Sequence, residues 1–86
     1  MPAISRFYGI VISFYFNDHN PPHFHAQYAG SNAEINILDG TVRNSSLPKR
    51  QLKMVLAWAE IHRDELMENW ELARAGKDLN PIPPLR

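Results

Sequence analysis

The chain is short, balanced in charge and free of cysteine. It has 86 residues, with nine basic and nine acidic side chains. A single domain of this size buries a modest core and commonly adds a disulfide, a metal or a second subunit. Without cysteine, disulfides and thiolate metal sites are excluded, which leaves a homodimer, a partner chain or a histidine–carboxylate metal site. Net charge near zero gives no general attraction to nucleic acid or to an anionic membrane.

The composition also indicates where the protein works. The apolar stretch at residues 10–16 is too short to span a bilayer and lacks the flanking features of a secretory signal. The lack of cysteine fits a reducing compartment. We therefore expect a cytoplasmic protein without a membrane partner.

The first half of the chain predicts an antiparallel sheet, with a central strand at residues 10–16. This stretch is rich in β-branched and aromatic side chains, and both faces of the strand are substantially apolar. Residues 6–8 would extend the strand beyond a bend or bulge at Gly9. Residues 17–22 combine Asn, Asp and Pro and predict a turn.

Two further strands are expected at residues 23–29 and 33–38, because apolar and polar side chains alternate in both. Residues 30–32 have the composition of a hairpin connection. An Asp-Gly turn signal follows the later strand, and residues 41–43 would add a short fourth strand at the edge. The expected sheet thus has three or four strands.

The second half of the chain predicts two helices. The first begins near Ser46, which would act as N-cap, with Pro48 in the tolerated first turn. Apolar residues then recur at helical spacings of three, four and seven, with a gap at residues 62–63. We expect the helix to break near residues 62–64, with Asp64 capping a second helix that stops at Gly76. The alternative is one uninterrupted helix that serves as an interaction arm.

Together these elements predict an α+β fold, in which a three- to four-stranded antiparallel sheet is followed by two C-terminal helices packed on one of its faces. Residues 1–76 would form a single α+β domain. Residues 77–86 contain three prolines and would form an extended, proline-rich tail.

The most concentrated group of polar side chains lies at residues 17–25. This run holds three of the four histidines, with one aspartate and two asparagines. His23 and His25 are two residues apart on an expected strand, so their side chains project from the same face. His19 or Asp18, brought round by the turn, would supply a third ligand. Imidazole and carboxylate suit a divalent transition metal such as zinc, iron, nickel or manganese.

The same residues also fit metal-free acid–base catalysis. His23 or His25 would be the general base, and Asp18 would orient an imidazole and favour its charged form. A phosphoester or RNA substrate would need nearby cations and polar groups. The candidates are Arg6, Arg43, Asn17 and Asn20. A third interpretation is that the run merely builds a turn, which explains its amides and prolines but not two histidines on one strand face.

The chain carries PAISRFYGI at residues 2–10, NDHNPPHFHA at residues 17–26 and RDELMENW at residues 63–70. With these segments it resembles a family of small bacterial proteins called domain of unknown function 4160. The resemblance extends to Ala75, and the histidine–proline run is its hallmark. Such proteins resemble one half of two-gene cassettes. Their usual neighbour is a second family, domain of unknown function 2442, some members of which carry a helix-turn-helix.

The resemblance implies a toxin–antitoxin module, with this chain as the toxin and its neighbour as the neutralising, DNA-binding partner. The leading hypothesis is a toxin-like effector that hydrolyses RNA or another phosphoester. Its catalytic residues would be Asp18, His19, His23 and His25. One alternative is a non-enzymatic module that binds a protein partner or a metal. Another is a DNA-binding regulator built on the two helices, although the acidic second helix fits a phosphate backbone poorly.

Overall fold

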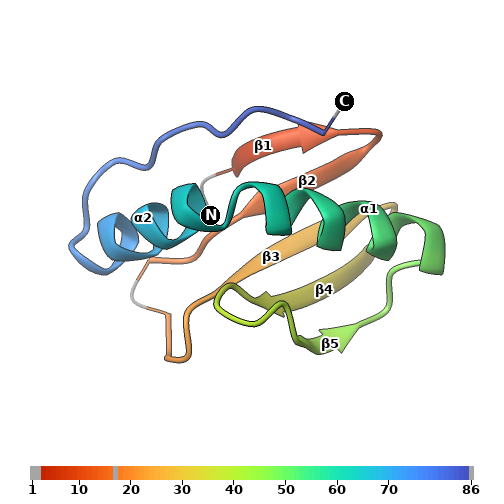
Figure 1. Cartoon of the computed structure of the whole chain (residues 1–86), viewed down its shortest axis with the longest axis horizontal. Helices are drawn as coiled ribbons and strands as arrows, with labels where there is room; N and C mark the ends of the chain where they lie inside the picture. Colours follow the sequence, from red (N-terminus) through yellow and green to blue (C-terminus); the bar gives the residue numbers. More distant parts are fainter. Residues whose placement is uncertain (1–2, 17, 86) are drawn as a thin grey trace.

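The computed structural model describes residues 3–16 and 18–85. The strands are β1 (Ala3–Phe7), β2 (Ile10–Ser13), β3 (His23–Tyr28), β4 (Ser31–Asn36) and β5 (Val42–Ser45), and the helices are α1 (Lys49–Ile61) and α2 (Arg63–Arg74). The strands form one antiparallel sheet in chain order. Both helices lie across the same face of this sheet, and the C-terminal segment runs back beside β1 (Figure 1). The predicted α+β class is confirmed.

Within the described residues the sheet has five strands, one more than the upper number that the sequence predicts. The difference arises at Gly9, which is not a bend within one strand. Tyr8 and Gly9 have φ values of 49° and 78° and form a two-residue turn, across which Phe7 pairs with Ile10. A type I′ hairpin turn needs positive φ at both central residues. Tyrosine rarely adopts positive φ, so local sequence patterns do not reveal this turn.

The β3–β4 hairpin also turns earlier than predicted. Its turn is Ala29-Gly30, with φ values of 47° and 84°, and Tyr28 pairs with Ser31 across it. Ser31 is therefore already in β4, and β4 ends two residues before the predicted strand does. The alternation of faces is unaffected, because the pairing keeps the apolar positions of β3 and β4 on one side of the sheet.

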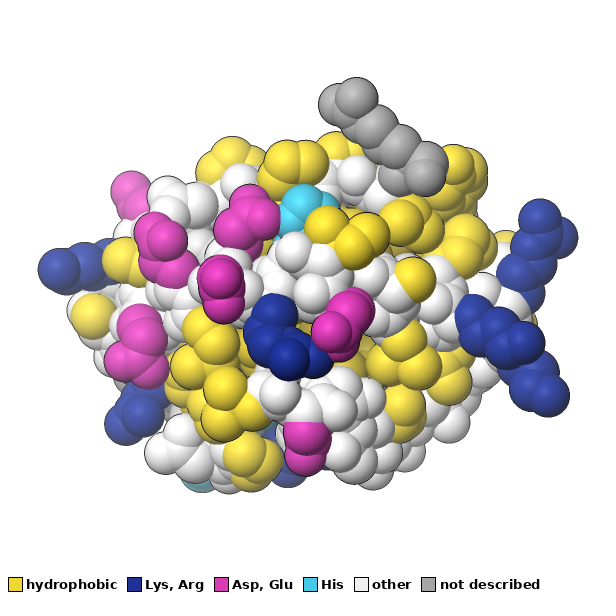
Figure 2. Space-filling view, viewed as in Figure 1, with side chains coloured by type: hydrophobic (Ala, Val, Ile, Leu, Met, Phe, Trp, Pro, Cys, Tyr) yellow, Lys and Arg dark blue, Asp and Glu magenta, His cyan; other side chains and the backbone are white. Residues whose placement is uncertain are grey.

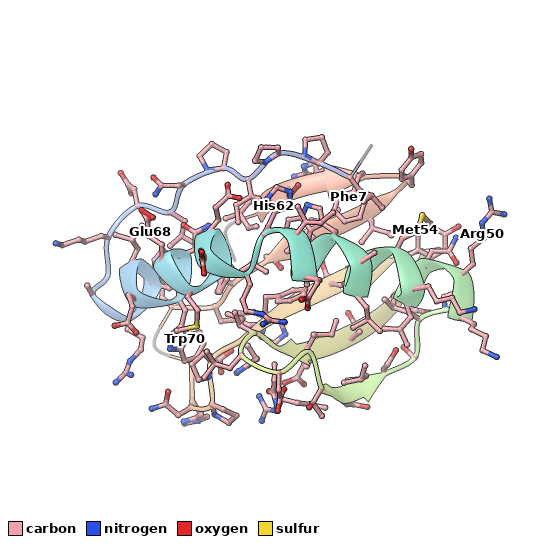
Figure 3. All side chains as sticks on the ribbon, in the orientation of Figure 1. Phe7, Arg50, Met54, His62, Glu68 and Trp70 are labelled. Atoms are coloured by element: carbon pink, nitrogen blue, oxygen red, sulfur yellow. The ribbon has the colours of Figure 1, made fainter. Side chains whose placement is uncertain are left out.

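The core lies between the helices and one face of the sheet. The large side chains that are fully buried there are Ile10, Ile12, Phe14, Phe24, Ile35, Val55, Trp58, Leu66 and Trp70. The Trp58 ring packs against Phe7 and Phe24, with ring centroids 5.3 and 5.9 Å apart. Phe7 lies between β1 and the helices (Figure 3). The apolar stripe of α1 thus holds the helix on the sheet.

The helical segment breaks at His62, as the spacing of its apolar residues predicts. The predicted caps are wrong. Pro48 precedes α1, and in the described part of the chain neither helix has a side-chain N-cap hydrogen bond. Ser46 instead accepts the backbone N–H of Asn32 at 2.9 Å, which ties the end of β5 to β4. Asp64 lies in the first turn of α2, where an acidic side chain favours the helix dipole.

The C-terminal tail is extended, and it packs onto the domain. Gly76 follows α2 with a φ of 70°, which suits the predicted helix stop. Ile82 is buried, and its backbone N–H donates to the carbonyl oxygen of Ile4 at 2.9 Å. Asn69, which is fully buried, holds the backbone of Asn80 through two hydrogen bonds of 2.8 Å. The tail therefore covers the β1 edge of the sheet.

Replacing Asn69 with alanine is expected to lower the free energy of unfolding by about 2 to 3 kcal/mol, because the backbone N–H and C=O of Asn80 would lose their partners. Urea denaturation, monitored by circular dichroism, measures this loss in the free energy of unfolding. Asn80→Ala is the matched control, since it keeps that backbone and loses only a side-chain bond to Glu68. The Asn80→Ala control should lower the free energy of unfolding by less than about 0.5 kcal/mol. Equal losses in the two variants would contradict the anchoring role of Asn69.

Charged side chains are unevenly distributed over the outer surface of the helices. Acidic side chains gather over α2, and basic side chains project at the end where α1 begins (Figure 2). Arg50 projects at the α1 end and Glu68 lies on α2 (Figure 3). Among the described residues, no helix is long and apolar enough to cross a membrane.

Candidate functional site

Three side chains of the histidine run meet at one end of the sheet. His23 and His25 come from β3, and Asp18 comes from the loop that precedes it. Oδ2 of Asp18 lies 2.9 Å from Nε2 of His23 and 3.0 Å from Nε2 of His25. One ligand atom from each of the three residues lies within 4.8 Å of the others. We refer to these three residues as the His–Asp centre.

The loop before β3 holds the carboxylate in one orientation. Oδ1 of Asp18 accepts the backbone N–H of His19 at 2.9 Å, so Oδ2 is the oxygen that faces the two rings. The far end of the loop is held by Pro22, whose carbonyl accepts the backbone N–H of Ile37 at 3.0 Å. The Asn20–Pro21 peptide bond between these points is cis. A backbone hydrogen bond thus ties the far end of the loop to the residue after β4, whereas the near end is held locally, by the Asp18 side chain and the next backbone N–H.

The two histidines differ in their access to solvent. The side chain of His23 is 2% exposed, whereas that of His25 is 16% exposed. The His23 ring lies near the rings of His25 and Trp70, with centroids 5.1 and 5.4 Å apart, and Trp70 extends from α2 toward this end of the sheet (Figure 3). Tyr15 lies edge-on to His25, with centroids 4.3 Å apart. His25 is therefore the imidazole that a ligand can reach.

A backbone carbonyl determines which nitrogen of His23 carries a proton. Nδ1 of His23 lies 2.8 Å from the carbonyl oxygen of Pro21. That oxygen can only accept, so Nδ1 is the donor. In the neutral ring, Nε2 then presents a lone pair to the Asp18 carboxylate, which is also an acceptor. Two acceptors 2.9 Å apart are compatible only if a proton or another cation lies between them.

The Asp18 carboxyl is ionised at neutral pH. Burial raises its pKa, but the hydrogen bond from His25, the hydrogen bond from the His19 backbone and the charges of the two imidazoles outweigh burial. Together they hold the pKa of Asp18 below its usual value of 3.8. An ionised carboxylate against two imidazoles can orient a base, stabilise an imidazolium or hold a metal cation.

His25 connects the His–Asp centre to a polar pocket on the face of the sheet opposite the helices. The pocket has a volume of about 520 Å³. Its lining residues are Tyr15, His25, Gln27, Asn32, Glu34 and Asn44. His25 lies directly opposite Glu34 in the ladder, and Glu34 lies opposite Asn44. Because side chains alternate along a strand, the polar residues between the buried positions of β3 and β4 form the floor of the pocket.

The other polar candidates of the run lie apart from the centre. His19 and Asn20 are exposed, and the donor set found among the described residues has no member from either. Asn17 lies outside the described residues. Of the two alternatives for a third ligand, the fold thus brings Asp18 to the strand histidines and leaves His19 at the surface.

A family model, Domain of unknown function (DUF4160), matches residues 9–71 of the chain. This match covers well over half of the sequence and includes the whole His–Asp centre. The chain belongs to this family. No curated protein and no solved structure shows significant similarity to this chain. The DUF4160 description gives no activity, so the chemistry of the centre is the basis for a functional proposal.

The fold of this DUF4160 chain also brings to the pocket one charged residue, Glu34, that the sequence analysis does not single out as functional. Oε1 of Glu34 lies 3.7 Å from Nε2 of His23 and 3.6 Å from Nη1 of Arg43. Alternation along its strand places Glu34 on the outward face, but only the strand register sets it opposite His25. Arg6 pairs with Val11 and so lies on the pocket face, near the β1 edge.

Proposed function

We propose that this chain is the toxin-like effector of a bacterial two-gene module and hydrolyses RNA or another phosphoester at the His–Asp centre. The observation that carries the proposal is the convergence of Asp18, His23 and His25 at the edge of an open polar pocket. Hydrolysis needs groups that take a proton from water and return one to the leaving oxygen. Imidazole and carboxylate are the side chains most often used for this work.

The three members of the centre differ in position and therefore in role. His25 borders the pocket, so the reacting water and the scissile bond would lie beside it. Asp18 holds both rings in place through one oxygen. His23 is buried behind them and is a positioning residue for the metal-free reaction. Arg43, which contacts Glu34 at the pocket, is the nearest candidate for contact with a phosphate.

A partner protein of the domain of unknown function 2442 type, encoded by a neighbouring gene, would neutralise this effector. An open pocket on the face of the sheet opposite the helices is a surface that a partner can occlude. Such an effector would act in the cytoplasm, where its RNA substrate and its partner are found. The acidic surface over α2 (Figure 2) opposes the alternative of a DNA-binding regulator, because like charges repel a phosphate backbone.

The test is induction of the chain alone in a bacterial host, beside the His23→Ala/His25→Ala double variant. The native chain is expected to arrest growth, the neighbouring gene to relieve the arrest, and the double variant to have no effect. Circular dichroism of the purified double variant verifies that it is folded. If the double variant does not fold, His25→Ala alone replaces it in the test. His25 is the more exposed of the two rings, so its removal should disturb the fold less.

Two outcomes would oppose the proposal. A folded double variant that still arrests growth would remove the His–Asp centre from the mechanism. Absence of arrest in every combination would favour a non-enzymatic module that binds a protein partner or a metal through the same residues.

A further inference from the structure

We infer that the His–Asp centre binds one divalent transition-metal ion through Nε2 of His23, Nε2 of His25 and Oδ2 of Asp18. The inference deepens the proposed function and rests on it only for the role of the ion in hydrolysis. Binding itself is argued from the positions of the donor atoms and from their hydrogen bonds.

The first argument is the buried lone pair of His23. Its Nδ1–H donates to the Pro21 carbonyl, and its Nε2 points into the centre from a side chain that is 2% exposed. Histidines that bind a metal through one nitrogen nearly always donate the other N–H to a carbonyl or a carboxylate, which orients the ring. The Pro21 carbonyl supplies this outer contact. His23 therefore has the tautomer and the orientation of a metal ligand.

The second argument is that one cation satisfies all three donor atoms together. Nε2 of His23 and Nε2 of His25 converge on the same oxygen of Asp18, at 2.9 and 3.0 Å. A proton placed on one ring satisfies the contact of that ring alone. A single ion that replaces the Nε2 proton of His25 satisfies the lone pairs of both imidazoles and the negative charge of Asp18 together.

Two of the three spacings between the donor atoms, those from Asp18 to the two rings, are close to the spacing that such an ion needs, and all three atoms lie within 4.8 Å of one another. Nitrogen and oxygen ligands lie about 2.0 to 2.2 Å from zinc, so atoms bound to one ion are about 3 to 3.5 Å apart. The two contacts to Asp18 are a few tenths of an ångström shorter than the middle of that interval. Asp18 lies on a loop whereas the histidines lie on a paired strand, so a small outward shift of the carboxylate makes room for the ion.

The donor set supplies three protein ligands, and one of them, His25, also lines the polar pocket. Metal sites with three protein ligands and one open position are typical of catalysis, whereas structural zinc sites have four protein ligands. In the proposed reaction, a bound ion would supply a more acidic water as nucleophile at neutral pH. Glu34, whose Oε1 lies 3.7 Å from Nε2 of His23, lines the pocket and would be available there as a hydrogen-bond acceptor.

The test is titration of untagged, chelator-treated protein with Co²⁺ and Zn²⁺, followed by calorimetry and, for Co²⁺, by visible absorption. We expect one ion per chain and a higher melting temperature with metal. Asp18→Asn and His25→Ala should each weaken binding by at least about 10- to 100-fold, which is the loss typical when only an outer contact of a metal ligand is removed. His19→Ala is the matched control, because it removes a neighbouring imidazole that is exposed and outside the donor set. Its affinity should equal that of the native chain.

The inference is overturned if the native chain shows no saturable binding of Co²⁺ or Zn²⁺, or if Asp18→Asn and His19→Ala change the metal affinity equally. The two proposals can fail separately. Saturable binding without growth arrest would keep the metal site and remove the toxin-like effector. Growth arrest by a chain that binds neither ion, with RNA hydrolysis unaffected by chelator, would keep the effector and overturn the metal site.

Discussion

Asp18→Asn is expected to abolish growth arrest and to lower the rate of phosphoester hydrolysis by about 100-fold or more. The asparagine has nearly the same shape as the aspartate, but it lacks the negative charge that faces both imidazoles. Without that charge, His23 and His25 lose the group that orients them, and a bound cation loses its anionic ligand. Colony counts after induction and cleavage of a labelled RNA by the purified variant measure the two effects.

Asp39→Asn is the matched control for this experiment. Oδ1 of Asp39 accepts the backbone N–H of Thr41 at 2.9 Å, just as Oδ1 of Asp18 accepts that of His19. The two substitutions therefore disturb similar turn hydrogen bonds, but Asp39 is exposed and outside the His–Asp centre. Asp39→Asn should leave growth arrest unchanged. If Asp18→Asn folds and is as toxic as this control, the carboxylate has no part in the mechanism.

Trp58→Ala is expected to give the largest loss of stability in the domain, about 3 to 5 kcal/mol in the free energy of unfolding. Trp58 is fully buried, its ring packs on Phe7 and Phe24, and its Nε1–H donates to the carbonyl of Pro83 at 2.9 Å. A small domain has about 5 to 15 kcal/mol of stability in total. The variant should therefore unfold at a much lower urea concentration than the native chain.

Two further variants separate the contributions of Trp58. Trp58→Phe keeps an aromatic ring in the core and loses the hydrogen bond to Pro83. Its loss of stability should therefore be clearly smaller than that of Trp58→Ala. Ile61→Ala removes a side chain from the same helix that is 68% exposed, and it should change stability by less than about 0.5 kcal/mol. A Trp58→Ala variant no less stable than Ile61→Ala would show that the core does not depend on this ring.

The elements that local patterns predicted well are those whose signals repeat along the chain. The spacing of apolar residues in the helical segment correctly located the break at His62, and Gly76 follows the last helix with positive φ. Alternation in β3 correctly separated Phe24 and Ala26, which are buried, from His25, which lines the pocket. Each of these signals depends on residues close in sequence, and burial of one face is sufficient to produce it.

The elements that local patterns missed depend on contacts between distant parts of the chain. The Tyr8-Gly9 turn places a tyrosine at positive φ, which its own propensity disfavours and pairing of β1 with β2 enforces. Ser46 has the side chain of an N-cap, but its hydroxyl contacts Asn32 of β4. In both cases a tertiary or cross-strand interaction outweighs the local preference.

The same division holds for the candidate site. The amino-acid sequence alone is enough to place two histidines on one face of a strand beside a turn that contains a carboxylate, because strand alternation and turn chemistry are local. Long-range packing alone brings Asp18 rather than His19 to those rings and sets Glu34 opposite His25. It also buries His23 beside Trp70. These three features depend on the path of the loop, on the register of the strands and on the position of the helix against the sheet. All three are determined by the packing of the whole core.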